Sequence, residues 1–491
     1  MLQCLSPSKR LLPALLAMSS LAWVFGCTVG PDYVKPRMDV PSRWNEATAS
    51  EAASGPADVA RWWTLFQDPR LDVLIEQAVQ SNNDLKLAEA RVREARALRG
   101  VVAADAYPDL TASGSYRRIR RSERSSPSAS AASSSSVGSL SGSNTQDLFD
   151  AGFDASWEID VFGGIRRSVE AAEADIGASE ENLRDVLVSL LAEVARNYLQ
   201  LRGDQLRLSI AAENIRAQQQ TLELTQARYD AGLSNELDVA QAKAQLAGTE
   251  AQVPRLESSA RQAIHQLGVL LGKDPGALLA ELSEQAPIPF GPPEVPVGLP
   301  SELLRRRPDV RRAEQDLAAA TARIGVATAD LFPKFSLTGA LGQQSVNFSD
   351  ITLPESRFYS FGPSISWPVF AGGRIRANIR VQDARQEQAA ILYEQSVLNA
   401  LKDVEDALVA YAKEQQTRKS LIESTEATRK AVDISNELYS QGLVDFLNVL
   451  INQRALFQSQ DSLAQSDQLV SQNLVALFKA LGGGWEVPPS P

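Results

Sequence analysis

Two long helical patterns dominate the chain. No proline occurs between Gly164 and Gly232 or between Gly373 and Gly442. Apolar residues recur there every three or four positions, as in "LRDVLVSLLAEVARNYLQL" from Leu183. This spacing predicts amphipathic helices that pair along coiled-coil seams. At about 1.5 Å per residue, the first helix would span roughly 100 Å if continuous, which is deeper than a compact domain.

Four shorter segments alternate with period two instead. In "FDASWEID", which begins at Phe153, apolar and polar residues take turns, so a strand would carry one apolar and one polar face. The dipeptides Tyr107-Pro108 and Phe332-Pro333 end the helices before two of these segments, because proline disfavours a helical predecessor. The predicted strands are 109–118, 152–161, 334–343 and 357–367.

The same order of elements occurs twice. "YDAGLSNELDVAQA" from Tyr229 matches "YSQGLVDFLNVLIN" from Tyr439, and Trp157 and Trp367 are separated by the same 210 residues. The first copy is longer than the second by ~15 residues, and a Ser-rich loop accounts for much of this excess. The loop is too polar to order itself. Gly232 and Gly442 are predicted helix C-caps at hairpin tips.

These patterns predict an α+β protein with an internal two-fold repeat of about 210 residues. Each copy reads helix, two strands, long helix, tight turn and helix, and six prolines between Pro287 and Pro300 mark the connector. The predicted segments are a signal peptide at 1–26, an N-terminal segment at 27–67, the first repeat at 68–272, the connector at 273–300, the second repeat at 301–482 and a tail at 483–491.

The N-terminus reads as an export signal. Lys9 and Arg10 precede the apolar stretch "LLPALLAMSSLAWVFG", and Gly26 stands before Cys27. Its removal also removes Cys4, so Cys27 is the sole cysteine of the mature chain and is either a free thiol or a lipid attachment point. The sequence "VFGC" resembles a bacterial lipoprotein signal, and Thr28, where some lipoproteins carry aspartate, favours the outer membrane.

The net charge and the absence of known motifs argue against several classes of function. The formal charge of −11 becomes −13 once Lys9 and Arg10 are removed, and this argues against nucleic-acid binding, which needs clustered Lys and Arg. His265 is the sole histidine, and no Cys/His cluster, phosphate loop or nucleophile motif occurs. The sequence therefore predicts no enzyme, no metal site and no cofactor apart from the lipid on Cys27.

The strands allow two readings. A soluble sandwich would bury the apolar face, but four strands are too few for a sandwich core. A membrane barrel would turn Phe153, Trp157 and Ile159 toward lipid and would turn a second set toward a watery lumen, namely Asp154, Glu158 and Asp160. One chain cannot close a barrel. Two chains give eight strands with a filled interior, and three give twelve with room for a channel.

Six ordered motifs resemble the outer-membrane lipoprotein channels of TolC and OprM type, the NodT group. They are "CTVGPDYVKP" at 27, "WWTLFQDPRLDVLIEQAV" at 62, "WEIDVFGGIRR" at 157, "RRPDVRRAEQDLAAATARIGVATADLFP" at 306, "WPVFAGGRI" at 367 and "LFKALGGGW" at 477. The resemblance implies a homotrimer with a twelve-stranded barrel, a periplasmic helical tunnel and an equatorial belt. It also implies an outer-membrane exit duct that joins a periplasmic adaptor to an inner-membrane transporter of the resistance-nodulation-division class.

The resemblance also places a gate and a docking site at the tips of the helical hairpins. The adaptor would face Gly232, Leu233, Gly442 and Leu443. Leu447, Ile451 and Arg454 share one helical face, so threefold symmetry would turn them into rings. The gate hypothesis makes Leu447 and Ile451 an apolar constriction, with Asp445, Asn448 and Arg454 as polar gate candidates. In the alternative, Leu447 and Ile451 are ordinary seam residues.

Two other functions stay open on the sequence alone. One is a type I secretion duct, in which the same fold would pass unfolded proteins. The other is a structural envelope lipoprotein without a pore, against which the four amphipathic strands argue. The sequence discloses neither the exported compound, nor the adaptor and transporter, nor the resting state of the gate.

Overall fold

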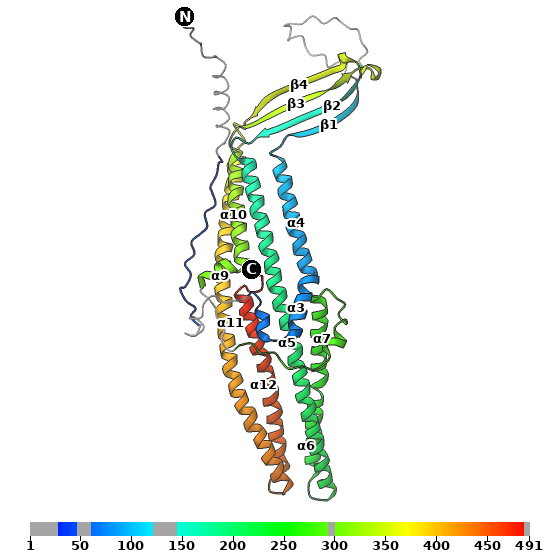
Figure 1. The fold of residues 1–491 in the computed structure, drawn as a ribbon, viewed down its shortest axis with the longest axis vertical. Helices are drawn as coiled ribbons and strands as arrows, with labels where there is room; N and C mark the ends of the chain where they lie inside the picture. Colours follow the sequence, from blue (N-terminus) through cyan, green and yellow to red (C-terminus); the bar gives the residue numbers. More distant parts are fainter. Residues whose placement is uncertain (1–27, 47–59, 121–144, 293–299, 486–491) are drawn as a thin grey trace, which may run out of the picture. The chain divides into compact units, whose positions relative to one another are not determined.

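The structure is a computed structural model that describes residues 28–46, 60–120, 145–292 and 300–485. The predicted signal peptide, Cys27, the Ser-rich loop, part of the connector and the end of the tail lie outside these ranges. The chain divides into two compact units (Figure 1). Within the described residues, unit 1 comprises 28–34, 95–120, 145–176 and 316–389, and unit 2 comprises 35–46, 60–94, 177–292, 300–315 and 390–485.

The elements follow the predicted order in both copies. The first copy has α3 (Pro69–Ser81), α4 (Asn83–Ala104), β1 (Asp109–Arg120), β2 (Thr145–Ile159), α5 (Gly164–Asp230), α6 (Glu236–Glu250) and α7 (Val253–Leu270). The connecting region has α8 (Leu279–Leu282) and α9 (Pro300–Arg306). The second copy has α10 (Pro308–Ala329), β3 (Lys334–Ser345), β4 (Arg357–Ser366), α11 (Arg374–Ser440) and α12 (Phe446–Ala480). Short 3-10 turns are η2 (Trp62–Phe66), η3 (Phe348–Asp350) and η4 (Pro354–Ser356).

Three pairs of corresponding elements have equal lengths in the two copies. Helices α5 and α11 both have 67 residues and begin 210 residues apart, at Gly164 and Arg374. Helices α4 and α10 both have 22 residues and begin 225 residues apart. Strands β1 and β3 both have 12 residues and keep the larger spacing.

Several predicted boundaries were wrong. Strand β2 begins at Thr145 rather than at residue 152, because its first residues pair with the end of β1 as far as Arg120. Strand β3 continues to Ser345, and β4 ends at Ser366. The helices that enter and leave the first repeat are each broken in two, at Asn82 and before Val253, whereas α12 is a single helix of 35 residues.

Unit 1 contains the sheet. Its four antiparallel strands are ordered β1-β2-β3-β4, so every strand pairs with its neighbour in sequence (Figure 1). Among the described residues of the whole chain, no helix is both long and apolar enough to cross a membrane.

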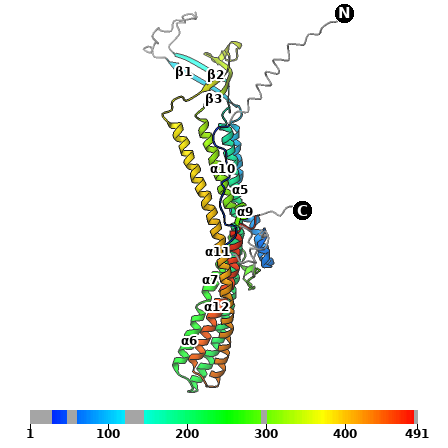
Figure 2. The same cartoon turned by 90° about the vertical axis from the view of Figure 1, so that its left-hand side faces the viewer.

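Unit 2 contains the main helical core. Trp62 of η2 stacks on Phe478 of α12 with ring centroids 5.5 Å apart, and both are buried. Tyr198 of α5 is also buried, and its hydroxyl donates a hydrogen bond to Asp68, the N-cap of α3, at 2.7 Å. Burial, together with this hydrogen bond, raises the pKa of Tyr198 to about 12. The two long hairpins, α5–α6 and α11–α12, turn at the same end of this unit (Figure 2).

Candidate functional site

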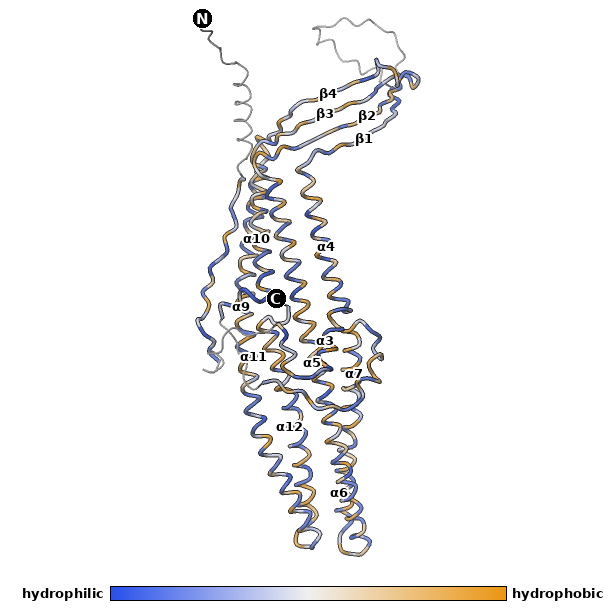
Figure 3. The backbone as a smooth tube through the Cα atoms, viewed as in Figure 1, coloured by the Kyte–Doolittle hydropathy of each residue, from blue (hydrophilic) through white to orange (hydrophobic). Residues whose placement is uncertain are grey.

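The antiparallel register gives the sheet one largely apolar face. Residues directly opposite each other in neighbouring strands project to the same side, and hydropathy alternates along each strand (Figure 3). Phe153 stands opposite Ala112 and Leu341, and Leu341 stands opposite Tyr359. Its apolar and glycine members are Leu110, Ala112, Gly114, Tyr116, Phe149, Ala151, Phe153, Ala155, Trp157, Ile159, Phe335, Leu337, Gly339, Leu341, Tyr359, Phe361, Pro363 and Ile365. Polar residues on the same side lie toward one end of the sheet and include Arg118, Asp147, Gln343, Ser345 and Arg357.

In the single chain this apolar face is largely uncovered. Phe361 is 82 % exposed and Tyr359 is 76 % exposed, and Phe153, Trp157 and Ile159 are exposed as well. An apolar patch that crosses four strands is larger than soluble monomers normally leave in water. The face therefore requires an apolar environment or partner.

The opposite face carries mainly polar or small side chains, with Ile119, Leu148 and Phe358 as its large apolar members. Asp154 and Glu158 lie on it, in register with Thr111, Ser336, Ala340, Ser360 and Ser364. Its hydroxyls pair across strands: Ser336 and Ser364 are 2.8 Å apart, and Ser113 donates to Asp154 at 3.3 Å. The residues predicted to face lipid and the strand acids predicted to face the lumen thus occupy opposite sides of one sheet.

Asp160 does not belong to the polar face. It follows the last residue of β2, and its carboxylate accepts a hydrogen bond from the backbone N–H of Arg166 at 2.9 Å and from the Arg166 side chain at 3.2 Å. These contacts place it at the start of α5, where an acid satisfies free N–H groups. The prediction that Asp160 is a strand residue was wrong, because β2 ends one residue earlier, at Ile159.

The apolar face has defined limits along the strands. At one end Tyr116 stacks on Phe149, with centroids 4.9 Å apart, and its hydroxyl donates to Asp147 at 3.0 Å. Beyond them, Arg118 and Asp147 form an ion pair at 3.6 Å. From Phe149 to Ile159 the strand advances ten residues, or roughly 33 Å. At a strand tilt of about 40°, this is a band roughly 25 Å high, which matches the hydrocarbon layer crossed by outer-membrane barrels.

Two tryptophans mark the other end of the sheet in equivalent ways. The indole N–H of Trp157 donates to the carbonyl of Ala106 at 2.9 Å, and that of Trp367 donates to the carbonyl of Leu331 at 3.0 Å. Each carbonyl belongs to the residue that precedes an aromatic-proline pair. Tryptophan with an apolar ring and a satisfied N–H is typical of a membrane interface.

The segment after Cys27 is docked onto unit 1. The side chain of Arg167, only 4 % exposed, donates to Asp32 at 2.6 Å, to Glu170 at 2.8 Å and to the carbonyl of Val29 at 3.2 Å. Gly30 has φ of 92°, and a Cβ built on it would lie 2.4 Å from the Cα of Gly325. We call residues 28–32 the anchor arm, because the predicted lipidation site immediately precedes them.

The hairpin tips have the predicted caps. Gly232 and Gly442 have φ of 72° and 76°, and the following N–H groups, of Leu233 and Leu443, bond to the carbonyls of Arg228 and Leu438. These bonds satisfy carbonyls at the helix ends. Leu233 and Leu443 are 69 % and 67 % exposed, so each tip presents a leucine at its turn.

The apolar gate candidates are not seam residues within the chain. Leu447 and Ile451 are 51 % and 56 % exposed, whereas the buried face of α12 near the tip is formed by Phe446, Val449 and Leu450. Asn448 is exposed, and Asp445 is the N-cap residue of α12, without a capping bond from its side chain. The Arg454 side chain donates to Gln245 of α6 at 2.8 Å.

Two arginine contacts had no signal in the sequence. Arg228 of α5 lies over the ring of Tyr439 at 4.7 Å and donates to its carbonyl at 3.1 Å, which joins the two hairpins near their tips. Arg167 holds the anchor arm. In both cases the partner is distant along the chain, so local periodicity could not identify it. Within the described ranges, no three Asp, Glu, His or Cys side chains are placed to hold a metal ion.

Comparisons with known proteins identify the family. A model of the family described as outer membrane efflux protein matches residues 74–273 and 299–483. The chain belongs to this family, and the predicted family, exit-duct function in a tripartite efflux pump and outer-membrane location are confirmed. The family consists of efflux channels rather than enzymes.

Individual relatives cover nearly the whole chain. Nodulation protein T of Rhizobium leguminosarum bv. trifolii is 32 % identical over 94 % of this chain and 95 % of its own. The pyoverdine export outer membrane protein OpmQ of Pseudomonas putida is 36 % identical over 91 % of this chain and 92 % of its own. A solved structure of the outer-membrane channel OprN is 40 % identical, with a TM-score of 0.84, and covers 94 % of this chain and 100 % of that one.

Proposed function

We propose that three copies of the chain close one twelve-stranded barrel, with β1 of each copy beside β4 of the next. These two strands are the outer strands of the sheet, and the free edge of an outer strand readily pairs with another strand. Eight strands would leave an interior filled by side chains, whereas twelve leave a water-filled bore. The observation that carries this proposal is the concentration of apolar residues on one face of the sheet and of most polar residues on the other.

The bore of such a barrel carries mainly acidic groups from β2. Asp150, Asp154 and Glu158 lie on the polar face, whereas Arg117 and Lys334 are its cationic strand residues. This balance favours cations modestly, because fixed charge raises the local concentration of counter-ions. A permissive passage with a weak charge preference suits a duct that receives compounds already selected elsewhere.

The helices of the three copies would enclose a periplasmic tunnel as an antiparallel coiled-coil barrel. The equal lengths of α5 and α11 and of α4 and α10 support an internal two-fold repeat, which gives six similar hairpins around a threefold axis. Lipid on Cys27, together with the anchor arm held by Arg167, would attach each copy to the outer membrane.

The duct passes drugs or other small toxic compounds from a resistance-nodulation-division transporter through a periplasmic adaptor. It is passive, and the transporter supplies the energy and selects the compound. The adaptor would contact the exposed tip leucines, Leu233 and Leu443. Leu447 and Ile451 would form apolar rings that close the tip, and their exposure in the single chain leaves them free to meet their copies.

Disulfide crosslinking between barrel edges tests the assembly. Cysteine pairs that combine Thr111 or Ser113 of β1 with Ser360 or Ser364 of β4 should join neighbouring copies and yield a covalent ring of three. Matched pairs that place one cysteine at Ala340 of the internal strand β3 should give no product between copies. Closed rings of two or four copies would overturn the twelve-stranded barrel. Conductance of the purified trimer in planar bilayers tests the pore itself.

A further inference from the structure

Each copy contains a joint where its last helix ends against the start of its entering helix. In the first joint, α7 ends at Leu270 and α4 begins at Asn83; in the second, α12 ends at Ala480 and α10 begins at Pro308. A glycine with positive φ follows each ending helix: 63° at Gly272 and 72° at Gly482. Both joints lie entirely within unit 2.

A buried asparagine connects the two helix ends of the first joint, beside a bond from the Ser81 hydroxyl to the carbonyl of Leu271 at 2.7 Å. Asn82 is buried, its Nδ2 donates to the carbonyl of Leu270 at 2.9 Å, and its Oδ1 accepts from the N–H of Leu85 at 2.9 Å. The side chain therefore satisfies one terminal carbonyl of α7 and one of the first free N–H groups of α4. Both bonds are neutral, and both stay within the joint.

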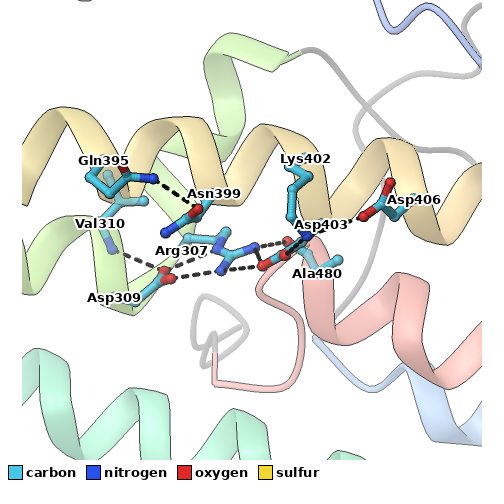
Figure 4. Close-up of polar contacts among 9 residues, drawn as sticks. All are labelled: Arg307, Asp309, Val310, Gln395, Asn399, Lys402, Asp403, Asp406 and Ala480. Atoms are coloured by element: carbon cyan, nitrogen blue, oxygen red, sulfur yellow. Dashed lines mark hydrogen bonds and ion pairs between the residues drawn. The ribbon is translucent and has the colours of Figure 1, made fainter.

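Arg307 takes the corresponding position in the second joint. It follows Asn82 by 225 residues, and Ala480 follows Leu270 by 210, the two spacings that relate the copies. All five of its N–H donors have acceptors (Figure 4). Nε and Nη2 hold Asp309 of α10 at 3.0 and 2.6 Å, Nη1 donates to the carbonyl of Ala480 at 3.2 Å, and Nη1 and Nη2 both reach Asp403 of α11 at 3.1 Å.

The contact with Asp403 has no counterpart in the first joint. Glu193 of α5 stands 210 residues before Asp403, but its side chain is exposed and makes no hydrogen bond or ion pair within the described part of the chain. Arg307 thus ties the second joint to its long helix, whereas Asn82 has no corresponding bond to α5 among the described residues. Helix α5 is instead bonded to the start of α3, through Tyr198 and Asp68. The long helix concerned, α11, ends at Ser440, two residues before the tip glycine Gly442.

We propose that Arg307 is a positioning residue that fixes α11 to the α10–α12 joint and thereby holds the α11–α12 hairpin in register, whereas Asn82 makes no corresponding bond to α5. A charged, five-donor group is needed because a neutral asparagine can connect two helix ends but cannot reach a third helix. The consequence for the gate rests on the proposed duct function, whereas the tie itself can be measured without it.

The two copies supply the matched variants. R307N installs the residue of the first joint, which can still connect the two helix ends but cannot reach Asp403. D403N removes the ionic tie and an exposed ion pair with the neighbouring Lys402 at 3.5 Å, and R307A removes both the connection and the tie. R323A is the control, because Arg323 forms an exposed ion pair with Asp175 at 2.6 Å and lies outside the joint.

Hydrogen exchange of the full-length trimer, read by mass spectrometry, separates these effects. R307N and D403N should accelerate exchange in residues 403–440 about threefold or more while residues 305–312 and 476–483 stay protected. R307A should accelerate all three segments, and R323A none of them. The inference is overturned if R307N behaves as R307A at the joint, or if D403N leaves exchange in α11 unchanged.

Conductance in planar bilayers then reports the consequence for the gate. R307N and D403N should open more often than wild type. If wild type itself does not conduct, the proposed duct assembly fails, but the exchange experiment still decides whether Arg307 ties α11. If wild type conducts and the variants with faster α11 exchange open no more often, the tie does not control hairpin register at the tip and the inference fails.

Discussion

Replacing Phe153 with arginine tests which side of the sheet meets lipid. Phe153 is the fifth of eleven residues between Phe149 and Ile159, so it lies near the middle of the apolar band. An arginine on the lipid face of a barrel costs about 2–4 kcal/mol at the bilayer midplane and about 0–1 kcal/mol near an interface. Phe153→Arg should therefore destabilise the barrel by about 2–4 kcal/mol per chain.

Two further arginine variants make the prediction specific. Ile159 lies on the same face at the end of the band, so Ile159→Arg should cost about 1 kcal/mol. Ser113 lies opposite Gly152, at nearly the depth of Phe153 but on the polar face, and Ser113→Arg should cost less than about 1 kcal/mol because its charge would meet water and Asp154. The expected order of destabilisation is Phe153, then Ile159, then Ser113.

Guanidinium unfolding of trimers in lipid vesicles measures these differences. The midpoint shift multiplied by the unfolding slope gives each change in free energy, and tryptophan fluorescence follows the transition because Trp157 and Trp367 lie at the end of the sheet. The reasoning is refuted if Ser113→Arg destabilises as much as Phe153→Arg, or if Ile159→Arg is the most destabilising of the three. Either result would mean that the apolar face does not meet the bilayer.

Three other predictions concern the helices and the anchor arm. Arg167→Ala should release the anchor arm and raise the rate of proteolysis within residues 28–46 by about tenfold or more. The control Arg99→Ala, which breaks an exposed ion pair with Glu173, should leave that rate unchanged. Equal rates in the two variants would show that Arg167 does not hold the arm. Because the pKa of Tyr198 rises from about 10 unfolded to about 12 folded, the protonated hydroxyl stabilises the fold fully below pH 10. That stability, on the order of 3 kcal/mol, should be lost as the pH rises from 10 to 12. Denaturant titration should show this loss in wild type and not in Tyr198→Phe, and an identical loss in both would mean that another group causes it. Ile451→Ser should wet the closed tip and raise its conductance several-fold in planar bilayers, so an unchanged closed state would remove Ile451 from the gate.

Alternation along single strands predicted the two faces of the sheet but not their continuity. Periodicity assigned Phe153 and Asp154 to opposite sides. It could not show that Phe153 shares its side with Tyr359, since that follows from register across three strands. The start of β2 was misplaced for the same reason: residues 145–151 pair with β1, and their strand character depends on that partner.

Local signals located the helix ends better than the helix breaks. Positive φ at Gly232 and Gly442 confirms the caps that their position between helical and polar residues indicated. The break before α7 had a signal that went unread, since Pro254 lies at the start of that helix. The roles of Arg167 and Arg307 had none, because each depends on acceptors more than 90 residues away.

The two copies make the same contacts at the sheet and different contacts at the joints. At the sheet, Trp157 and Trp367 make the same bond to equivalent carbonyls, as expected if every strand meets one uniform membrane. At the joints, Asn82 and Arg307 share a position but not a chemistry. A uniform environment offers no reason for that difference. If Arg307 fixes α11 as proposed, the difference means that a charged contact holds the α11–α12 hairpin and has no equivalent at Asn82.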